Sequence, residues 1–254
     1  EKSVGFRERS ITLDERWSVM RYLRLEWKKL PIKFYLCVAA GLFVFSLFIG
    51  LLFLFLPAAE MDSEDVVFST SWGGLIVMVS SISMFEFSVM GAVVHGKGVL
   101  DEYMGRKVLL LFSYPVRREV LFWVKIAVSG GFTAAITVAA NLVAVLTVGL
   151  VSDIGLVMPE FFGIFEIIQG ILYSLFVAVG VEAISLISLW FGFLRQSLTA
   201  GIIAALILAI LITQVFAMNL VWNMGMLLLI AIVVVFGAGS FCSLERKIRN
   251  MEVV

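Results

Sequence analysis

The stretch FYLCVAAGLFVFSLFIGLLFLFL, residues 34–56, decides the fold class, because it is a long apolar run without a single charge. A run of about 20 apolar residues is long enough to cross the hydrocarbon core of a bilayer as an α-helix. Five more apolar runs follow it, at residues 71–94, 120–151, 161–194, 198–216 and 222–242. The sequence therefore predicts an all-α integral membrane protein with six transmembrane helices.

The composition supports this prediction. Of the 254 residues, 61% are hydrophobic and 15% are charged, against roughly 45–50% and 25% in soluble domains. Nineteen Lys and Arg balance nineteen Asp and Glu, so the chain lacks the positive net charge that would favour nucleic acid as a partner. Cys37 and Cys242 are too few for a disulfide framework. No signal-peptide pattern precedes the first run, which we expect to be a retained helix.

The positions of the basic residues predict the orientation. All Lys and Arg fall within residues 2–33, 97–125 and 246–249 or at Arg195, whereas the connectors 57–70, 152–160 and 217–221 contain none. Lys and Arg concentrate on the cytoplasmic side of membrane proteins. We therefore expect a multi-pass protein of the cell membrane with both termini in the cytoplasm. The short spacing between Arg195 and the fifth run predicts a tight turn between antiparallel neighbours.

The leader, residues 1–33, contains a predicted amphipathic helix at residues 13–30. Its Trp, Leu and Met residues alternate with Arg and Lys, a pattern typical of helices that lie on the membrane surface and contact lipid. Pro31 then separates this helix from the first span. The alternative is a solvated basic segment that only enforces orientation.

The connector between the second and third spans, residues 95–119, is too long for a simple turn, since helix connections usually need about 2–8 residues. Gly96 and Gly98 are expected to end the preceding helix. Asp101 and Glu102 are expected to begin a short helix. Its apolar face comprises Val99, Leu100, Tyr103, Val108 and Leu111. A turn about Pro115 is then expected to lead into the third span.

After the sixth span, residues 243–254 are expected to form a cytoplasmic tail.

The block LLFSYPVRREVL, residues 110–121, with Lys125 after it, resembles the segment that follows the second span in ABC-2 type permeases. These are the membrane subunits of one exporter class of ABC transporters. Six spans, cytoplasmic termini and an amphipathic leader also resemble this family.

The resemblance implies a permease subunit whose 95–119 connector docks on a separate cytoplasmic ATPase, present in two copies, which binds ATP and Mg. This chain has no phosphate-binding Gly-rich motif, so we expect it to bind no cofactor or metal and to have no catalytic residues. The expected ATPase-coupling residues are Val99, Leu100, Asp101, Glu102, Tyr103, Arg106, Leu111, Pro115, Arg117, Arg118 and Glu119. The alternative is a membrane-lying loop without a partner.

Two acids lie inside predicted spans, where an ionised carboxylate is costly. Glu86 and Glu182 are candidates for a translocation pathway for a cationic or amphipathic substrate. They are alternatively protonated, or hydrogen-bonded to Ser83 and Ser185 one turn away. Asn141 and Gln169 are candidates for the same pathway or for hydrogen bonds between helices.

Small residues in the fifth span repeat at four-residue spacing, at Gly201, Ala205 and Ala209. Such a face permits close helix approach, and the resemblance places this span at the interface with a second permease copy or paralogue. Packing within one chain is the alternative. His95, the sole histidine, is expected to be a core or surface residue, and the acids of residues 60–65 are expected in a solvated external loop.

The leading functional prediction is ATP-driven export of a peptide, drug, lipid or ion. A secondary transporter, a membrane anchor or immunity subunit, and a membrane-embedded enzyme are the alternatives. The enzyme is disfavoured because one His is present and every Asp lies outside the spans.

Overall fold

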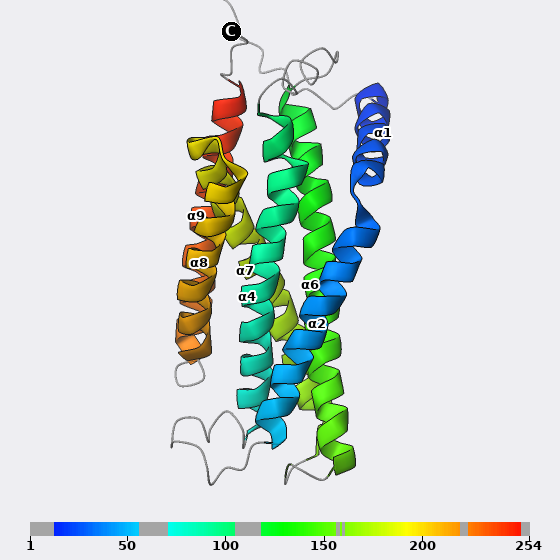
Figure 1. The fold of residues 1–254 in the computed structure, drawn as a ribbon, viewed down its shortest axis with the longest axis vertical. Coiled ribbons are helices and arrows are strands. Elements are labelled where there is room, and N and C mark those ends of the chain that lie inside the picture. The colour runs from blue at the N-terminus through cyan, green and yellow to red at the C-terminus, as the bar shows by residue number, and fades with distance from the viewer. Residues whose placement is uncertain are drawn as a thin grey trace, which may run out of the picture.

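The computed structural model describes residues 13–55, 71–104, 118–155, 158, 161–218 and 223–249. Within these ranges the chain is helical, and they contain no β-strand (Figure 1). The helices are α1 (Leu13–Lys29), α2 (Ile32–Phe55), α4 (Trp72–Gly98), the 3-10 helix η2 (Leu100–Glu102), α6 (Arg118–Gly155), α7 (Ile164–Arg195), α8 (Leu198–Met218) and α9 (Asn223–Arg249). This agrees with the all-α class predicted from the sequence.

Five helices in the described part of the chain are long and apolar enough to cross a membrane, at Ile32–Phe55, Trp72–Glu102, Val120–Gly155, Ile164–Arg195 and Leu198–Ala217. They coincide with the first five predicted spans to within a few residues, except that the second extends further toward the connector. The sixth predicted span falls on α9, whose side chains are described only from residue 231, and it stays a prediction.

Local sequence signals explain several helix ends. Pro31 lies between α1 and α2, and the side chain of Ser71 caps α4 by accepting from the backbone N–H of Gly74 at 3.1 Å. α7 ends at Arg195, the next residue Gln196 has a left-handed backbone with φ of 47°, and α8 begins at Leu198. The predicted tight turn is therefore confirmed. α6 continues unbroken through Gly130 and Gly131, and α7 continues unbroken through Gly180.

α4 and α7 form the centre of the bundle. α4 packs against α2, α6, α7 and α8, and α7 packs against α4, α6, α8 and α9. Large apolar side chains such as Phe45, Phe48, Ile203 and Phe236 point outward and are more than half exposed. Outward apolar residues around a buried centre are what a bundle surrounded by lipid needs.

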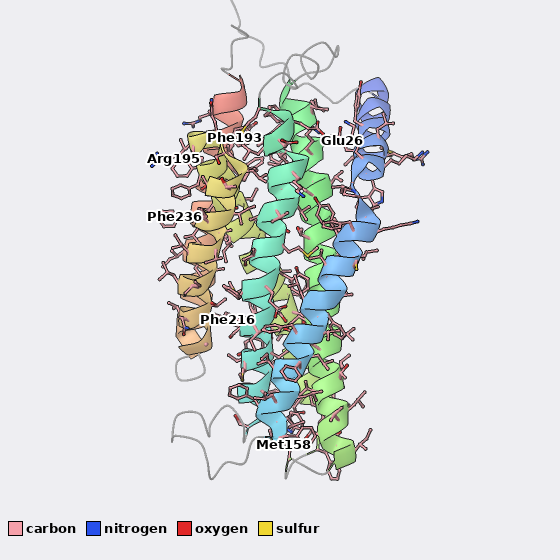
Figure 2. The ribbon with its side chains drawn as sticks, in the orientation of Figure 1. Glu26, Met158, Phe193, Arg195, Phe216 and Phe236 are labelled. Atoms are coloured by element: carbon pink, nitrogen blue, oxygen red, sulfur yellow. The ribbon has the colours of Figure 1, made fainter. Side chains whose placement is uncertain are left out.

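The cationic helix ends lie together. The end of α4 with Lys97, the start of α6 with Lys125, the end of α7 with Arg195 and the end of α9 with Arg246 are all at the top in Figure 1. We call this the basic end. Figure 2 shows Glu26 and Arg195 near it and Met158 at the opposite end. α1 lies beside α6 at the basic end. Its Trp27 and Leu25 side chains are exposed next to the charged residues Arg24 and Lys28.

Candidate functional site

Lys125 joins three segments of the chain at the basic end. Its Nζ donates to Glu26 Oε2 at 2.9 Å and to Glu102 Oε2 at 2.6 Å. Glu26 Oε1 also accepts from Lys29 Nζ at 2.7 Å. The side chain of Lys125 is only 1% exposed. These contacts, which we call the Lys125 bridge, tie α1, η2 and α6 together.

The electrostatics of the bridge favour the ionised carboxylate. Burial raises the pKa of Glu26, but hydrogen bonds from Lys29 and Lys125 and their positive charges outweigh burial, and the net pKa lies below its ordinary value. Burial and the negative charges of Glu102 and Glu26 raise the pKa of Tyr103. Glu26 is therefore an anion, and Tyr103 a neutral phenol, at physiological pH.

The apolar start of the connector is buried by the chain itself. Val99, Leu100 and Tyr103 are each at most 5% exposed. They pack in one cluster with Phe122, Leu189, Phe193 and Leu244 from α6, α7 and α9. We predicted these three residues as ATPase contacts, but their side chains are inaccessible to a partner in this structure, because the apolar face of the connector completes the core at the basic end.

The other predicted coupling residues are only partly within the structure. Asp101 is exposed, and Glu102 is engaged in the Lys125 bridge. Arg106, Leu111, Pro115 and Arg117 lie outside the described residues, as does Val108. Arg118 and Glu119 begin α6, but their side chains are not described. The short helix expected after Gly98 is described only as η2, which begins one residue earlier than predicted, at Leu100.

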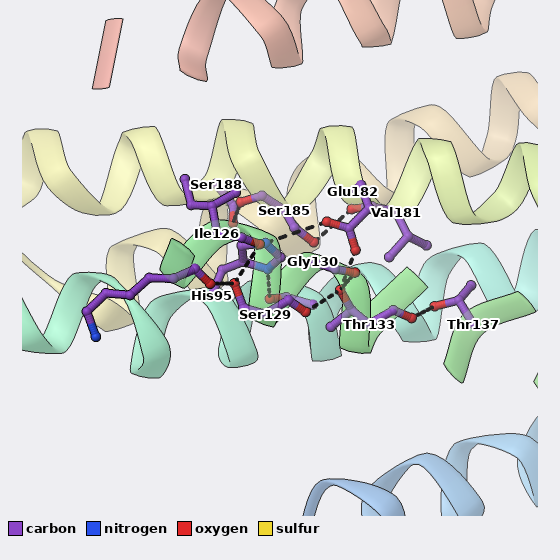
Figure 3. A network of polar contacts seen from close by, with 12 residues as sticks. His95, Ile126, Ser129, Gly130, Thr133, Thr137, Val181, Glu182, Ser185 and Ser188 are labelled. Carbon is purple, nitrogen blue, oxygen red and sulfur yellow. Dashed lines mark hydrogen bonds and ion pairs between the residues drawn. The ribbon is translucent and has the colours of Figure 1, made fainter. Parts of the chain in front are cut away.

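Glu182 lies at the centre of a polar cluster between α4, α6 and α7 (Figure 3). Thr133 Oγ1 donates to Glu182 Oε1, and His95 Nε2 lies 3.5 Å from Glu182 Oε2. His95 is fully buried, and its Nδ1 donates to the Gly91 carbonyl oxygen at 2.9 Å. A favourable contact between Nε2 and the carboxylate then requires one proton shared by the pair. Within the described residues His95 Nε2 has no hydrogen-bond partner, so the cluster places an imidazole nitrogen and a carboxylate near each other without a formed hydrogen bond between them.

Gly130 and Ser185 lie near the Glu182 carboxylate but have different roles. A Cβ on Gly130 would lie 2.9 Å from Glu182 Oε2, so a glycine lets α6 approach the carboxylate closely. The expected partner Ser185 instead donates to the Val181 carbonyl oxygen at 2.7 Å. The Glu182 side chain also lines a cavity of about 710 Å³ between α6, α7 and α9, whose other lining residues are apolar.

Glu86 lies elsewhere. It is 6% exposed and lines a separate cavity of about 430 Å³ between α2, α4 and α8. Its expected partner Ser83 forms a 2.9 Å hydrogen bond with Ser46 instead. Within the described ranges neither carboxylate oxygen of Glu86 has a hydrogen-bond partner. The structure therefore does not bring Glu86 and Glu182 together on one cavity.

Asn141 connects the three central helices. Its Nδ2 donates to Ser80 Oγ on α4 at 3.2 Å and to Ser174 Oγ on α7 at 3.0 Å. Asn141 is fully buried and lines neither acid's cavity. Its role is thus the hydrogen bond between helices. Gln169 is half-buried on α7 and also lines neither cavity.

The small-residue face of α8 packs inside the chain. A Cβ on Gly201 would lie 3.1 Å from the Ser188 carbonyl oxygen and 3.5 Å from Gly192 Cα. Ala205 and Ala209 are fully buried. In this structure Gly201, Ala205 and Ala209 therefore pack within the chain, which is the alternative to a dimer interface, and the glycine at 201 permits close packing between α7 and α8.

The sequence analysis missed the Lys125 bridge and the role of His95. It named Lys125 only as the end of the connector motif, and it gave Thr133 no role. A signal was available, since Lys125 is a single cation several residues inside a long apolar run, where an ionised group needs a partner. Nothing in the sequence identified that partner as Glu26.

Metal-binding groups are not apparent in the part of the chain that the structure describes. No three His, Cys, Asp or Glu side chains gather closely enough there to hold an ion. Cys37 and Cys242 are free and exposed. The acidic residues between 60 and 65 lie outside the described ranges.

The chain is similar to the uncharacterized protein YcbO of Bacillus subtilis (strain 168). The two are 26% identical over 195 residues, which cover 77% of this chain and 84% of YcbO. No family model and no solved structure matches the chain. Because YcbO is itself uncharacterized, the functional argument rests on the residues of this chain.

Proposed function

We propose that this chain is the permease subunit of an ABC-2 type ABC transporter, which provides the path for ATP-driven export across the cell membrane. The ATP and Mg would be bound by two copies of a separate cytoplasmic ATPase. A second permease copy or paralogue would complete the transporter, through a face other than Gly201–Ala209.

The observation that carries this proposal is the Lys125 bridge. A permease needs a rigid link between the segment that an ATPase moves and the helices that line the path. Lys125 fixes the base of the 95–119 connector, through Glu102, to both α6 and the leader helix α1. A push on the connector would therefore move α1 and, through Pro31, the first span. The gathering of Lys and Arg at this end supports a cytoplasmic location.

The burial of the connector residues limits which of them could contact the ATPase. Val99, Leu100 and Tyr103 are buried, whereas Asp101 is exposed. The docking surface in this proposal consists of Asp101 and the connector beyond residue 104. The buried residues would serve as the rigid base of that surface.

The test is purification of the full chain from its native membrane in mild detergent, followed by mass spectrometry of co-eluting proteins. The comparison variant has Leu111 and residues 115–118 replaced by Ala and Ser. A matched control replaces exposed Phe45 and Phe48 by Leu on the outer face of α2, far from the basic end. The proposal expects an ATPase with the wild-type chain and the control but not with the connector variant. Absence of an ATPase from all three contradicts it.

A secondary transporter is a second candidate, and the His95–Glu182–Thr133 cluster favours it. Ionisable residues buried in membrane spans commonly form proton relays, and this cluster places His95 on α4 near Glu182 on α7. Transport of a substrate by the purified chain in vesicles with a pH gradient and without ATP would support this candidate. Transport that depends on ATP and an ATPase would exclude it.

A further inference from the structure

Glu86 is an acid without a hydrogen-bond partner among the residues that the structure describes. Its side chain is 94% buried in a helix apolar enough to cross a membrane, and in the described part of the chain neither oxygen accepts a hydrogen bond. Native proteins almost always satisfy buried polar atoms. The exception marks a place where a group from outside the chain would complete the site.

The two serines closest to Glu86 in the sequence form hydrogen bonds elsewhere. Ser83 Oγ is hydrogen-bonded to Ser46 Oγ at 2.9 Å, and Ser88 Oγ donates to the Met84 carbonyl oxygen at 2.6 Å. Both serines lie on the same helix as Glu86, within one turn of it. A shift of either would break a buried hydrogen bond that already exists. The Glu86 carboxylate therefore lines the cavity without a hydrogen bond from either serine.

That cavity has about 430 Å³ and lies between α2, α4 and α8. A volume in the range of roughly 300–1,000 Å³ is usual for small-molecule sites. Aromatic rings supply much of the lining, from Phe34, Tyr35 and Phe85. Apart from Glu86, the charged residue that lines it is Lys97, whose Nζ lies 5.9 Å from the centroid of the Phe34 ring.

The two charged residues mark opposite ends of the cavity. Both are on α4, where the rise of 1.5 Å per residue places their backbones about 16 Å apart. Lys97 is exposed at the basic end, and Glu86 is buried deeper in the bundle. Phe34 and Leu206, which also line the cavity, are exposed as well, so the cavity opens on the outer face of the bundle while the carboxylate lies at its buried end.

We propose that this cavity binds an amphipathic monocation, a protonated amine with an apolar body, and that its ammonium donates to Glu86. An ammonium supplies the donors that both carboxylate oxygens lack and neutralises a charge that is costly in a membrane span. The aromatic faces attract the same cation, and the apolar lining accepts the body. Lys97 at the entrance repels ligands with several positive charges. The inference gives a substrate class to the permease proposed above.

The test is direct binding to the purified full chain in detergent. The probe is a primary alkylamine labelled with a dansyl group, and its partner is the same molecule with the amine acetylated, which removes the charge and keeps the apolar body. Dansyl fluorescence rises on entry into an apolar site. We expect saturable binding of the amine, and binding of the acetylated molecule that is weaker by roughly tenfold or more, because the ion-paired hydrogen bond is lost.

Three variants locate the site. Glu86→Gln has nearly the same shape and is expected to bind the amine only as weakly as the acetylated probe. Glu166→Gln, the matched control at a partly buried acid of α7 that does not line this cavity, is expected to bind the amine as wild type does. Val89→Trp fills the cavity while leaving Glu86 in place and is expected to exclude both probes, which keeps the test decisive if Glu86→Gln fails to fold.

Equal affinity of wild type for the two probes would overturn the proposal, since the cavity would then hold apolar molecules such as lipid chains. Unchanged amine binding by Glu86→Gln, or an equal loss in Glu166→Gln, would overturn it as well. The assay contains no ATPase, so its outcome is separate from that of the proposed function. Amine binding without a co-purifying ATPase would support the binding site and contradict the proposal of an ABC permease. A co-purifying ATPase without amine binding would contradict only the proposed ligand class.

Discussion

Replacing Lys125 by Met tests the Lys125 bridge, because Met keeps most of the length of the side chain and removes its charge. The Nζ contacts at 2.9 and 2.6 Å each correspond to about 6 kcal/mol of attraction at an effective dielectric constant of about 20. Desolvation of a side chain that is 1% exposed offsets much of this. Solvent also screens the pair with Glu102, which is 29% exposed. Loss of one partner of a buried ion pair usually costs about 3–5 kcal/mol, and we expect a change of this size.

The assay is the free energy of unfolding of the purified chain, measured by titration with SDS in mixed micelles. Lys97→Met is the matched control, since Lys97 is exposed at the same end and outside the bridge. A triple variant with Glu26→Gln, Glu102→Gln and Lys125→Met should recover most of the loss, because no unpaired charge is then left buried. The reasoning is refuted if Lys125→Met costs no more than Lys97→Met, or if the triple variant is as unstable as the single one.

Three further outcomes are expected. Because its pKa is lowered in the folded chain, Glu26 contributes stability that is complete above its ordinary pKa of 4.5 and is lost as the pH falls through the lowered value. The protection factors of α1 amides, which are corrected for the intrinsic exchange rate at each pH, should therefore fall in acid. Glu26→Gln should remove this pH dependence, and its persistence in that variant would contradict the assignment. Gly201→Leu should lower the free energy of unfolding by about 1–3 kcal/mol through overpacking, while Gly131→Leu, where a Cβ meets nothing within 4 Å, should not; a change of oligomeric state with unaltered stability would show that the Gly201 face is an interface after all. Asn141→Val should lower the free energy by about 0.6–1.7 kcal/mol in the same titration, and an unchanged value would count against its two hydrogen bonds to serines.

The spans were predictable because their signal is local. A long apolar run specifies a membrane helix whatever surrounds it, and Pro31 and the Arg195–Leu198 turn mark boundaries by their own chemistry. The end of α4 was predictable too, because the helix continues past the apolar run to Gly98, one of the two glycines expected to end it. The end of α6 was less predictable, since the helix continues past residue 151 to Gly155.

The polar contacts depend on partners that are distant in the sequence. Glu26 and Lys125 are separated by 99 positions, and Thr133 and Glu182 by 49. The sequence showed that such ionisable groups need partners, but it suggested the nearest hydroxyls, Ser83 and Ser185, which bind elsewhere.

The small-residue face of α8 was ambiguous for a related reason. Four-residue spacing of Gly and Ala permits close approach to any helix, so it does not distinguish a second chain from α7. The choice depends on which helix lies opposite Gly201, and only the arrangement of the bundle decides this.

The central claim is that this chain couples to an ATPase through its basic end. The most direct measurement is the rate of ATP hydrolysis by the material purified through the full chain, compared with the connector variant at Leu111 and residues 115–118. The account predicts ATP hydrolysis in the wild-type preparation, and none above background in the connector variant. Equal hydrolysis in both preparations, or none in either while the chain remains folded, would contradict it.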